Sequence, residues 1–387
     1  MTPPAAVSTG TPAPASADPV AAWAEGPAAV AAATLASLPG ITPGRLHALL
    51  SRWPDPLEAL AAVAAGRAVE AVPEGRLHPL PAARAGWLAA TLVRRGTRVL
   101  LSSADGFPIA DGVPDRPAVL LAEGDRPEVL GAPRVAVVGT RAASPHGLTD
   151  ARRLGAFLGA AGVSVVSGLA IGIDAAAHAG ALASVRDGTG PAGPIGVVAT
   201  GLDVVYPRRH AALYGEVRRR GLLIGEHGFG VPPSPGRFPV RNRIIAALAD
   251  VVVVVEATER GGARITAERA LDYGRPVLAM PGSRRNPAAA GCNALLADGA
   301  HPLLDPADVL VALGLTPGAR RGWSAPGPSR QLSPEAIRVE RALAGEAAHP
   351  DDLAARTGLS PGELAMAVEE LIDAGRVERC RGFVWPT

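Results

Sequence analysis

The chain of 387 residues carries a formal net charge of only +2, and 48% of it is hydrophobic but only 3% aromatic. This length and apolar content predict more than one domain and a sizeable core. The small charge and the scarcity of aromatic rings argue against nucleic-acid binding through bulk charge or mainly through stacking, so any such affinity needs a local basic patch.

Two features of the composition limit the chemistry further. All 38 basic residues other than histidine are arginines, which, with the many Ala, Gly and Pro residues, indicates a GC-rich coding bias. Arginine content alone is therefore weak support for phosphate binding. The two cysteines, Cys292 and Cys380, are far apart, which argues against a cysteine zinc site or a disulfide framework and favours a reducing compartment.

The first 21 residues are rich in Pro, Ala, Ser and Thr and contain no basic segment followed by an apolar core. They predict a disordered tail and not a signal peptide. No apolar run approaches the roughly 20 residues that span a bilayer. We expect a cytoplasmic protein with no membrane partner.

Residues 22–95 are rich in Ala and Leu and predict a helical domain. Within them, "LPGITPGRL" at 38–46 resembles a helix-hairpin-helix turn of the kind found in SAM-like domains, whose glycine N–H groups can contact a phosphate. The segment occurs once, and ordinary helix packing is the better interpretation.

Residues 96–315 alternate short apolar runs with helical segments. Because these runs lack polar alternation, they predict a mainly parallel sheet buried on both faces, that is, a doubly wound, extended Rossmann-like α/β domain. The expected strands are 134–138, 163–166, 195–199, 222–224, 251–255 and 277–279. The segment 187–194 predicts a surface loop, and the Pro/Gly-rich segment 316–333 a linker.

Residues 334–387 predict a winged-helix domain, with helix, turn, helix and then a hairpin. Ser360 and Glu363 form a capping box for the second helix. That helix is acidic, so we do not expect it to enter a major groove. Three arginines of the hairpin, Arg376, Arg379 and Arg381, can contact a phosphate backbone; a protein contact is an equally good interpretation.

Ligands of open α/β sheets bind at the carboxyl ends of the strands, so the segments that follow each strand predict the site. They are rich in glycine, hydroxyl groups and arginine, which together suggest a continuous anion-binding rim. As candidates for binding a ligand that bears phosphate groups we take Gly139, Thr140, Arg141, Ser144, Ser167, Gly168, Gly172, Phe238, Arg241, Asn242, Arg243, Gly262, Arg264 and Thr266. Asp174, His178 and Glu256 are taken as supporting residues.

The segment "GRFPVRNRIIAALAD" at 236–250 places Arg237, Arg241 and Arg243 where a helix begins. A helix N-terminus already carries partial positive charge, so this placement is unfavourable unless an anion binds there. The other interpretation is that these arginines pair with acids elsewhere in the fold.

Several chemistries are disfavoured by the motifs. Without lysine there is no P-loop, and no strand is followed by G-x-G-x-x-G. Asp174 and His178 are spaced as two metal ligands on one helix, but no third ligand accompanies them, and a hydrogen bond on the helix is the simpler interpretation. Ser167 lacks the G-x-S-x-G elbow. We expect no catalytic residues, no metal and no cofactor.

The motifs between residues 134 and 300 closely resemble the DNA-processing protein A family, also called DprA or Smf. The resemblance rests on "VGTRAASPHG", "VVSGLAIGIDAAAH", "GLDVVYP", "FPVRNRIIAALAD", "VVVVEA", "ITAERAL", "GRPVLAMPG" and "GCNALLADGA". It implies a homodimeric, non-enzymatic protein that binds single-stranded DNA, protects it and helps load RecA recombinase during natural transformation.

The resemblance also implies roles for individual residues. Arg141, Phe238, Arg241, Asn242 and Arg243 would line the DNA groove. Phe238 would offer a stacking face or, alternatively, anchor the loop from the core. Arg264 departs from the family pattern, which has an apolar residue there; it would add a phosphate contact or remain solvated.

An enzymatic alternative is a nucleoside-monophosphate phosphoribohydrolase, a related Rossmann-like group with P-G-G-x-G-T-x-x-E after the equivalent strand. The segment "RGGARITAER" keeps two glycines and Thr266. The position of the glutamate is occupied by Arg269, and Glu268 lies one residue short, about 100° away around the helix. This makes the alternative the weaker one.

Overall fold

The structure is a computed structural model that describes residues 23–24, 26–73, 77–186, 192–315, 332–343, 346–373, 376–380 and 382–386. The expected N-terminal tail, most of the expected linker and residues 187–191 of the expected surface loop lie outside these ranges. The boundaries expected between the three domains stay predictions.

The main sheet has ten strands in the described part of the chain, in the order β1-β2-β3-β7-β6-β5-β4-β8-β9-β10. Strands β4 to β10 run parallel, whereas β1, β2 and β3 form an antiparallel extension that joins β7. The strands are β1 Trp23–Ala24, β2 Arg98–Leu101, β3 Val119–Glu123, β4 Arg134–Val138, β5 Ser164–Ser167, β6 Ile195–Val197, β7 Leu222–Gly225, β8 Val251–Val254, β9 Val277–Ala279 and β10 His301–Pro302.

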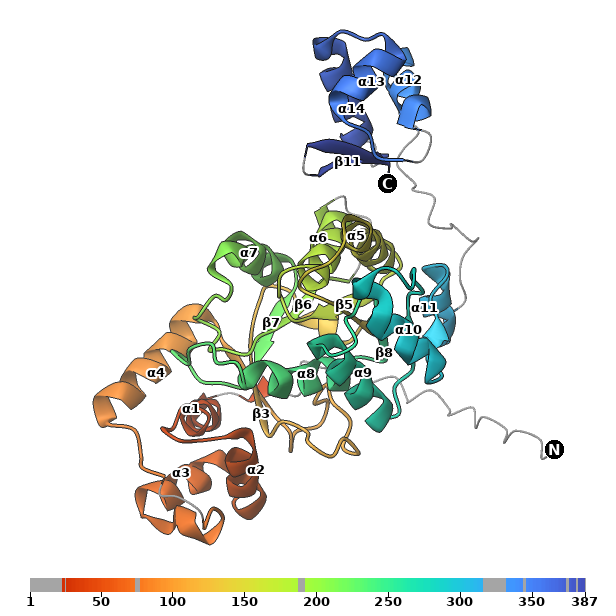
Figure 1. Ribbon diagram of the computed structural model, residues 1–387. Coiled ribbons are helices and arrows are strands. Elements are labelled where there is room, and N and C mark those ends of the chain that lie inside the picture. The colour runs from red at the N-terminus through yellow and green to blue at the C-terminus, as the bar shows by residue number, and fades with distance from the viewer. Residues whose placement is uncertain are drawn as a thin grey trace, which may run out of the picture.

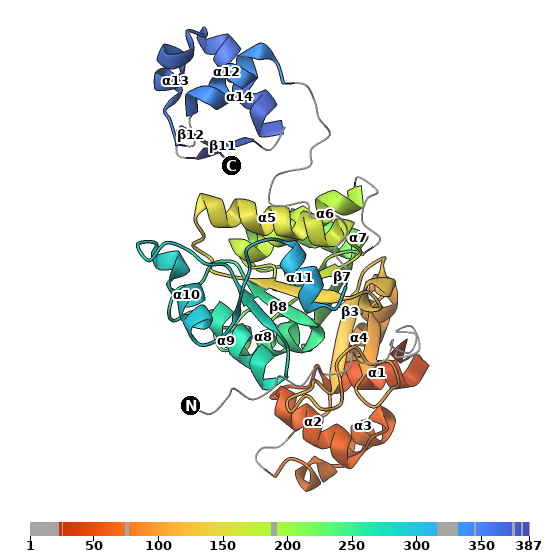
Figure 2. The same cartoon turned by 90° about the vertical axis from the view of Figure 1, so that its right-hand side faces the viewer.

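Helices cover both faces of this sheet, as Figures 1 and 2 show: α5 and α6 lie on one side, α8 and α9 on the other. The extended Rossmann-like prediction is confirmed, and the six expected strands correspond to β4 to β9. The helices up to residue 312 are α1 Gly26–Leu35, α2 Pro43–Arg52, α3 Pro56–Ala64, α4 Ala82–Arg95, α5 Pro145–Ala160, α6 Ile173–Arg186, α7 Ala211–Arg220, α8 Arg237–Leu248, α9 Gly262–Asp272, α10 Ala290–Ala297 and α11 Ala307–Ala312.

The pair α5 and α6 packs unusually closely because glycines face the neighbouring backbone. A Cβ on Gly155 would overlap the carbonyl of Ala177, and one on Gly180 would overlap the carbonyl of Arg152. The side chains of both helices then bury the alternate residues of β4, such as Val135 and Val137. This fixes the start of α5 beside the carboxyl ends of the strands.

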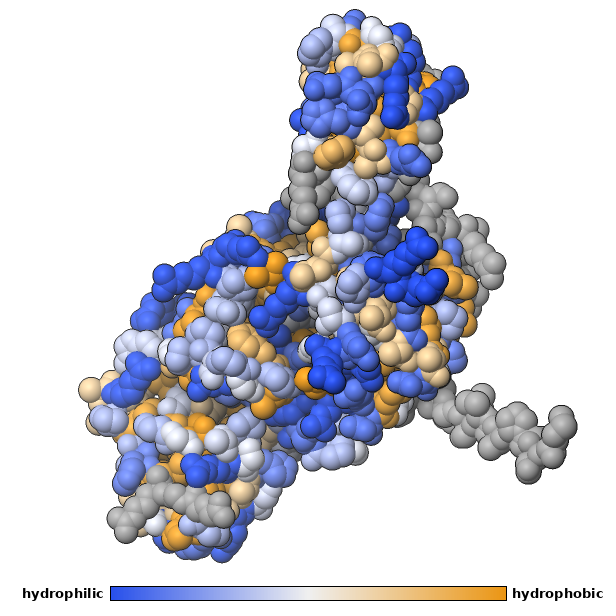
Figure 3. Space-filling model, viewed as in Figure 1, coloured by the Kyte–Doolittle hydropathy of each residue, from blue (hydrophilic) through white to orange (hydrophobic). Residues whose placement is uncertain are grey.

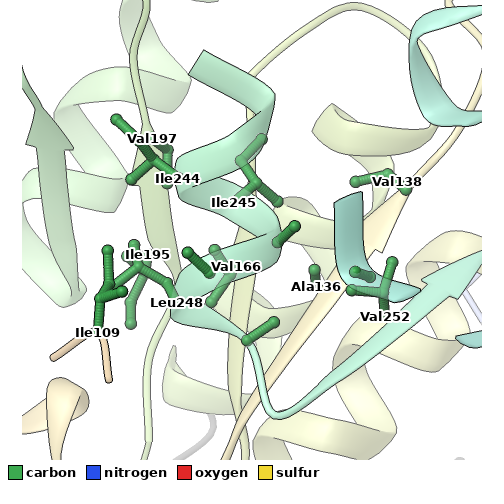
Figure 4. Close-up of a cluster of buried hydrophobic side chains, with 14 of the residues drawn as sticks. Ile109, Ala136, Val138, Val166, Ile195, Val197, Ile244, Ile245, Leu248 and Val252 are labelled. Atoms are coloured by element: carbon green, nitrogen blue, oxygen red, sulfur yellow. The ribbon is translucent and has the colours of Figure 1, made fainter. Parts of the chain in front are cut away.

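Helix α8 carries the arginine cluster, and its second half is anchored in the core. Ile244, Ile245 and Leu248 point toward Val166 and Val197 of the sheet in Figure 4, and all of them are buried. Burying such aliphatic side chains contributes about 1.5–3 kcal/mol each. The start of the helix is therefore held at one place on the sheet.

The N-terminal helices share a core with the sheet. Leu35 of α1, Leu49 of α2 and Leu88 of α4 belong to the same buried cluster as Val119 and Leu223 of the sheet. Strand β1 lies antiparallel to β2, which ties the beginning of this region to the sheet edge.

The C-terminal region contains helices α12 Pro334–Leu343, α13 Pro350–Thr357 and α14 Pro361–Asp373, followed by the hairpin of β11 Val377–Cys380 and β12 Phe383–Pro386. It has its own core. The capping box is present, since the Ser360 hydroxyl donates to Glu363 and accepts from its backbone N–H. Arg376 and Arg379 pair with Glu340 and Glu369. Arg381 lies outside the described residues.

In the described part of the chain, no helix is long and apolar enough to cross a membrane. On the face shown in Figure 3, hydrophilic residues predominate and apolar ones form only small patches.

Candidate functional site

The carboxyl ends of β4 and β8 meet where the strand order reverses, which is where doubly wound sheets bind ligands. The N–H of Thr140 donates to the carbonyl of Glu256 at 2.7 Å, which joins the two strand ends. Gly139 has no room for a Cβ beside Ile173. Gly172, at φ +87°, has none beside the Thr140 carbonyl. These glycines let the loops after β4 and β5 lie against each other.

Glu256 and Ser144 hold the start of α5. The Glu256 carboxylate accepts from the Ser144 N–H at 2.8 Å, from its hydroxyl at 2.6 Å and from the Asn286 amide at 3.3 Å. The Ser144 hydroxyl in turn caps the helix by accepting from the Gly147 N–H. Both predicted residues are therefore engaged within the protein, and they position the loop that bears Arg141.

The loop after β5 is held in a strained shape. Leu169 has a φ of +58°, which non-glycine residues rarely adopt. Its carbonyl lies 2.9 Å from Nδ1 of His210. Asp174 accepts from the N–H groups of Gly168 and Ala170 at 3.1 and 3.4 Å. These contacts fix the carbonyl of Gly168 toward α8.

Arg241 is only 5% exposed and fills the space beneath that loop. Its Nη1 donates to the carbonyl of Gly168 at 2.8 Å and to that of Val197. A Cβ on Gly168 would come within 2.5 Å of this guanidinium, so the glycine leaves room for it. Burial lowers the pKa of Arg241, and the negative charge of Asp174 opposes this change. Burial raises the pKa of Asp174, and the positive charge of Arg241 opposes that change.

Arg243 is also buried, at 8% exposed. Its guanidinium pairs with Glu226 and donates to the carbonyl of Asp115. Burial raises the pKa of Glu226, while the nearby Arg243 opposes that rise. For Arg243, these contacts support the interpretation that the arginine pairs with an acid of the same fold.

The remaining residues predicted at α8 and α9 also have internal partners. The Asn242 side chain accepts from Arg241 and donates to the Gly262 carbonyl at 3.1 Å. The buried Thr266 hydroxyl donates to the same carbonyl, also at 3.1 Å. Arg264 lies within 3.6 and 3.8 Å of the carboxylates of Glu268 and Asp298. Together they fix the start of α9 beside that of α8.

The hydroxyl of Ser167 donates to the Val137 carbonyl at 2.7 Å. His178 is fully buried, and burial lowers its pKa to about 4, so it is neutral at pH 7. Asp174 and His178 do not combine with a third ligand: among the described residues no cluster of His, Cys, Asp or Glu could hold a metal ion.

A small pocket of about 40 Å³ opens above Arg241. Its walls include Arg141, Tyr206 and Phe238. The rings of Tyr206 and Phe238 lie 5.4 Å apart, and the Arg141 guanidinium lies 5.1 Å from the centre of the Phe238 ring. Phe238 is half-buried, whereas Arg141 and Tyr206 are exposed.

Exposed arginines follow several of the parallel strands at this edge. Besides Arg141 after β4, they are Arg208, Arg209, Arg260, Arg284 and Arg285, in the segments after β6, β8 and β9. None of the six forms an ion pair with another described residue. The carboxyl edge thus presents exposed arginines without ion pairs to other described residues, and one of them, Arg141, lines an aromatic pocket.

Comparison with known proteins agrees with this architecture. Residues 99–314 match the family described as DNA recombination-mediator protein A, and residues 324–382 match the DprA winged helix domain. A Mycobacterium tuberculosis relative with DprA in its name is 38% identical over 309 residues, which cover 76% of this chain and 78% of the relative. The chain belongs to the DprA family.

Two further similarities concern Streptococcus pneumoniae. Its DNA processing protein DprA is 41% identical over 197 residues, 51% of this chain and 67% of that protein. The X-ray structure of DNA processing protein A from this organism covers 73% of this chain and 95% of its own, with a TM-score of 0.57 and 31% identity. The role of the DprA family, and of this member, lies in DNA processing and recombination.

The structure thus divides the predicted residues of this DprA family member. It brings Arg141, Gly168, Phe238 and Arg241 together around the pocket. It places Arg243, Thr266 and Ser167 inside the protein. Arg208, Arg209, Arg260, Arg284 and Arg285 are not among the predicted site residues. Their exposure is the signal that identifies them, and a sequence does not display exposure.

Proposed function

We propose that the carboxyl edge of the sheet binds single-stranded DNA and that the protein acts as a non-enzymatic recombination mediator. The observation that carries the proposal is the set of six exposed arginines, without ion pairs in the described part of the chain, in the segments that follow the parallel strands; one of them, Arg141, lines the pocket of Tyr206 and Phe238. Arginine forks suit phosphate oxygens, and aromatic faces accept bases irrespective of their sequence.

The preference for a single strand rests on the pocket and on membership of the DprA family. Phosphate contacts alone do not distinguish one strand from two. A ring such as Phe238 can stack only on a base that is free of its neighbours, and such bases belong to single strands. Arg141 lies over the same ring and places a cation beside the base.

The finer parts of the proposal follow from the family alone. We include in it protection of incoming single strands, loading of RecA during natural transformation, a homodimer and a cytoplasmic location.

The phosphoribohydrolase alternative gains no support from the geometry. The pocket has no acidic residue among the described residues that line it. Glu256 is engaged by Ser144 and Asn286, and Glu268 is near Arg264. We therefore keep the binding function as the single proposal.

The test is fluorescence anisotropy of a labelled oligo-dT and of a matched duplex across a salt series. Arg141→Ala and the double variant Arg208→Ala/Arg209→Ala are expected to weaken binding of the single strand. Each lost phosphate contact should reduce the slope of log affinity against log salt by about 0.7. None of the three arginines is buried, so these variants should keep the wild-type melting temperature.

Arg94→Ala is the matched control. Arg94 is an exposed arginine in the last turn of α4; it donates to the Thr91 hydroxyl of the same helix and lies outside the segments that follow the parallel strands. If Arg94→Ala and the edge variants weaken binding equally, the charge of the protein as a whole is responsible and the proposed location is wrong. If the wild type binds neither DNA at moderate salt, the proposal fails.

A further inference from the structure

Helix α4 exposes an aromatic side chain with an arginine stacked on it. Trp87 is 39% exposed, although Leu88 beside it is buried in the core. The guanidinium carbon of Arg84 lies 3.9 Å from the centre of the Trp87 ring. Phe229 meets the same ring edge-on at 6.4 Å. Arg84 is exposed and makes no ion pair with any described residue.

This pair lies at the same edge of the sheet as the pocket. Phe229 belongs to the segment that follows the carboxyl end of β7, and its carbonyl accepts from Arg84 at 3.4 Å. The next residue, Gly230, donates its N–H to the Asp203 carboxylate at 2.8 and 3.0 Å. Asp203 follows the carboxyl end of β6 and precedes Tyr206 of the pocket by three residues.

The segment from Phe229 to Phe238 therefore connects the Trp87 ring on α4 with the pocket. At one end it contacts Trp87, and at the other it enters the pocket beside Tyr206. Exposed aromatic rings are few: among the described residues the large exposed ones are Trp87, Tyr206 and Phe383. Two of these three rings, Trp87 and Tyr206, lie at the same edge of the sheet.

We propose that the single strand continues from the pocket onto α4, where a base stacks on Trp87 and Arg84 contacts a phosphate. An aromatic face with an adjacent unpaired cation is the combination that binds single-stranded nucleic acid irrespective of sequence. The inference rests on the proposed function and extends it from the Rossmann-like sheet to the N-terminal helices.

The experiment compares two lengths of oligo-dT by anisotropy, about four and about twelve nucleotides, which span the usual range of single-strand site sizes. Trp87→Ala should lower the affinity for the long oligonucleotide by about 5- to 150-fold, the range that stacking of one base covers. The short oligonucleotide, which the pocket alone can hold, should lose less than about 2-fold. Trp87→Phe should restore most of the affinity.

Two controls keep the test specific. Val93→Ala alters an 81% exposed residue six positions after Trp87, about 120° away around the same helix, and should leave both affinities unchanged. Trp87→Phe retains an aromatic ring against Phe229, so it reports on stacking even if Trp87→Ala lowers the melting temperature.

The outcomes separate the two proposals. If Trp87→Ala leaves the affinity for the long oligonucleotide unchanged while Arg141→Ala lowers it, the extension onto α4 is wrong and the proposed function stands. If both lengths lose affinity equally in Trp87→Ala, the ring acts by supporting the pocket, and the extension is also wrong. If the wild type binds neither length, the proposed function itself fails.

Discussion

Arg241 offers the sharpest test of how this site is built, because its charge is buried and its role can be separated from DNA binding. We consider Arg241→Met, which keeps a long side chain and removes the charge. The variant deprives the carbonyls of Gly168 and Val197 of their donor. It also leaves the buried carboxylate of Asp174 without the cation that opposes the rise of its pKa.

The expected loss is large. Leaving two buried carbonyls without a donor costs about 1–3 kcal/mol each, and the buried Asp174 carboxylate also loses a nearby opposite charge. A domain has only about 5–15 kcal/mol of stability in total, so Arg241→Met should be markedly destabilised or fail to accumulate. Asp174→Asn keeps a polar group at the same place and should be less harmful.

The decisive measurement is a double-mutant cycle by urea denaturation, followed by circular dichroism and tryptophan fluorescence. The double variant Asp174→Asn/Arg241→Met no longer contains the buried carboxylate. Its free energy of unfolding should therefore fall by about 0.5–3 kcal/mol less than the sum of the two single losses. If Arg241→Met unfolds within about 0.5 kcal/mol of the wild type, the reasoning is wrong. A normally stable Arg241→Met protein that no longer binds oligo-dT would show instead that Arg241 is a DNA ligand.

Three further predictions follow from the same geometry. Ser144→Ala removes the cap of α5 and a partner of Glu256, and should lower the free energy of unfolding by about 1–2 kcal/mol in urea titrations, whereas an unchanged midpoint would contradict the capping role. Gly172→Ala forces a Cβ toward the Thr140 carbonyl at positive φ and should cost at least about 1–3 kcal/mol by the same assay. For His178, burial lowers the folded-state pKa from 6.5 to about 4, so the unfolded state binds the extra proton between these values. The free energy of unfolding should therefore be highest above about pH 6.5 and fall by about 3 kcal/mol as the pH is lowered to 4. His178→Asn should show a shallower dependence on pH over this window, and an equal slope would rule out the assignment.

The strands were predictable from the sequence for a definite reason. A parallel strand buried on both faces needs consecutive apolar residues, and β4 and β9 coincide with the Val-rich runs 134–138 and 277–279. The antiparallel extension was not among the expected strands, although Val119–Glu123 is also an apolar run. Its pairing with β7 depends on contacts distant in the sequence, which periodicity does not encode.

The arginines at the start of α8 show where sequence reasoning about charge stops. The dipole argument indicates that Arg241 and Arg243 need hydrogen-bond acceptors or acids as partners, but it does not say whether a ligand or the protein supplies them. For Arg243, the partner Glu226 lies only 17 residues away in the sequence, so the sequence offers it as a candidate. The carbonyls of Gly168 and Val197, which receive Arg241, come from other strands and leave no signal near residue 241.

The difference between buried and exposed arginines gives the site a consistent physical logic. A buried guanidinium holds several carbonyls in fixed positions, because its five donors form a rigid fork and its charge cannot be lost by deprotonation. Arg241 uses these properties to tie the loop after β5 to the end of β6 beneath the pocket. An exposed guanidinium keeps its donors for a ligand, and Arg141 lies directly above, stacked on Phe238. If this division holds, substitutions of Arg241 should change folding first and affinity only as a consequence, while substitutions of Arg141 should change affinity alone.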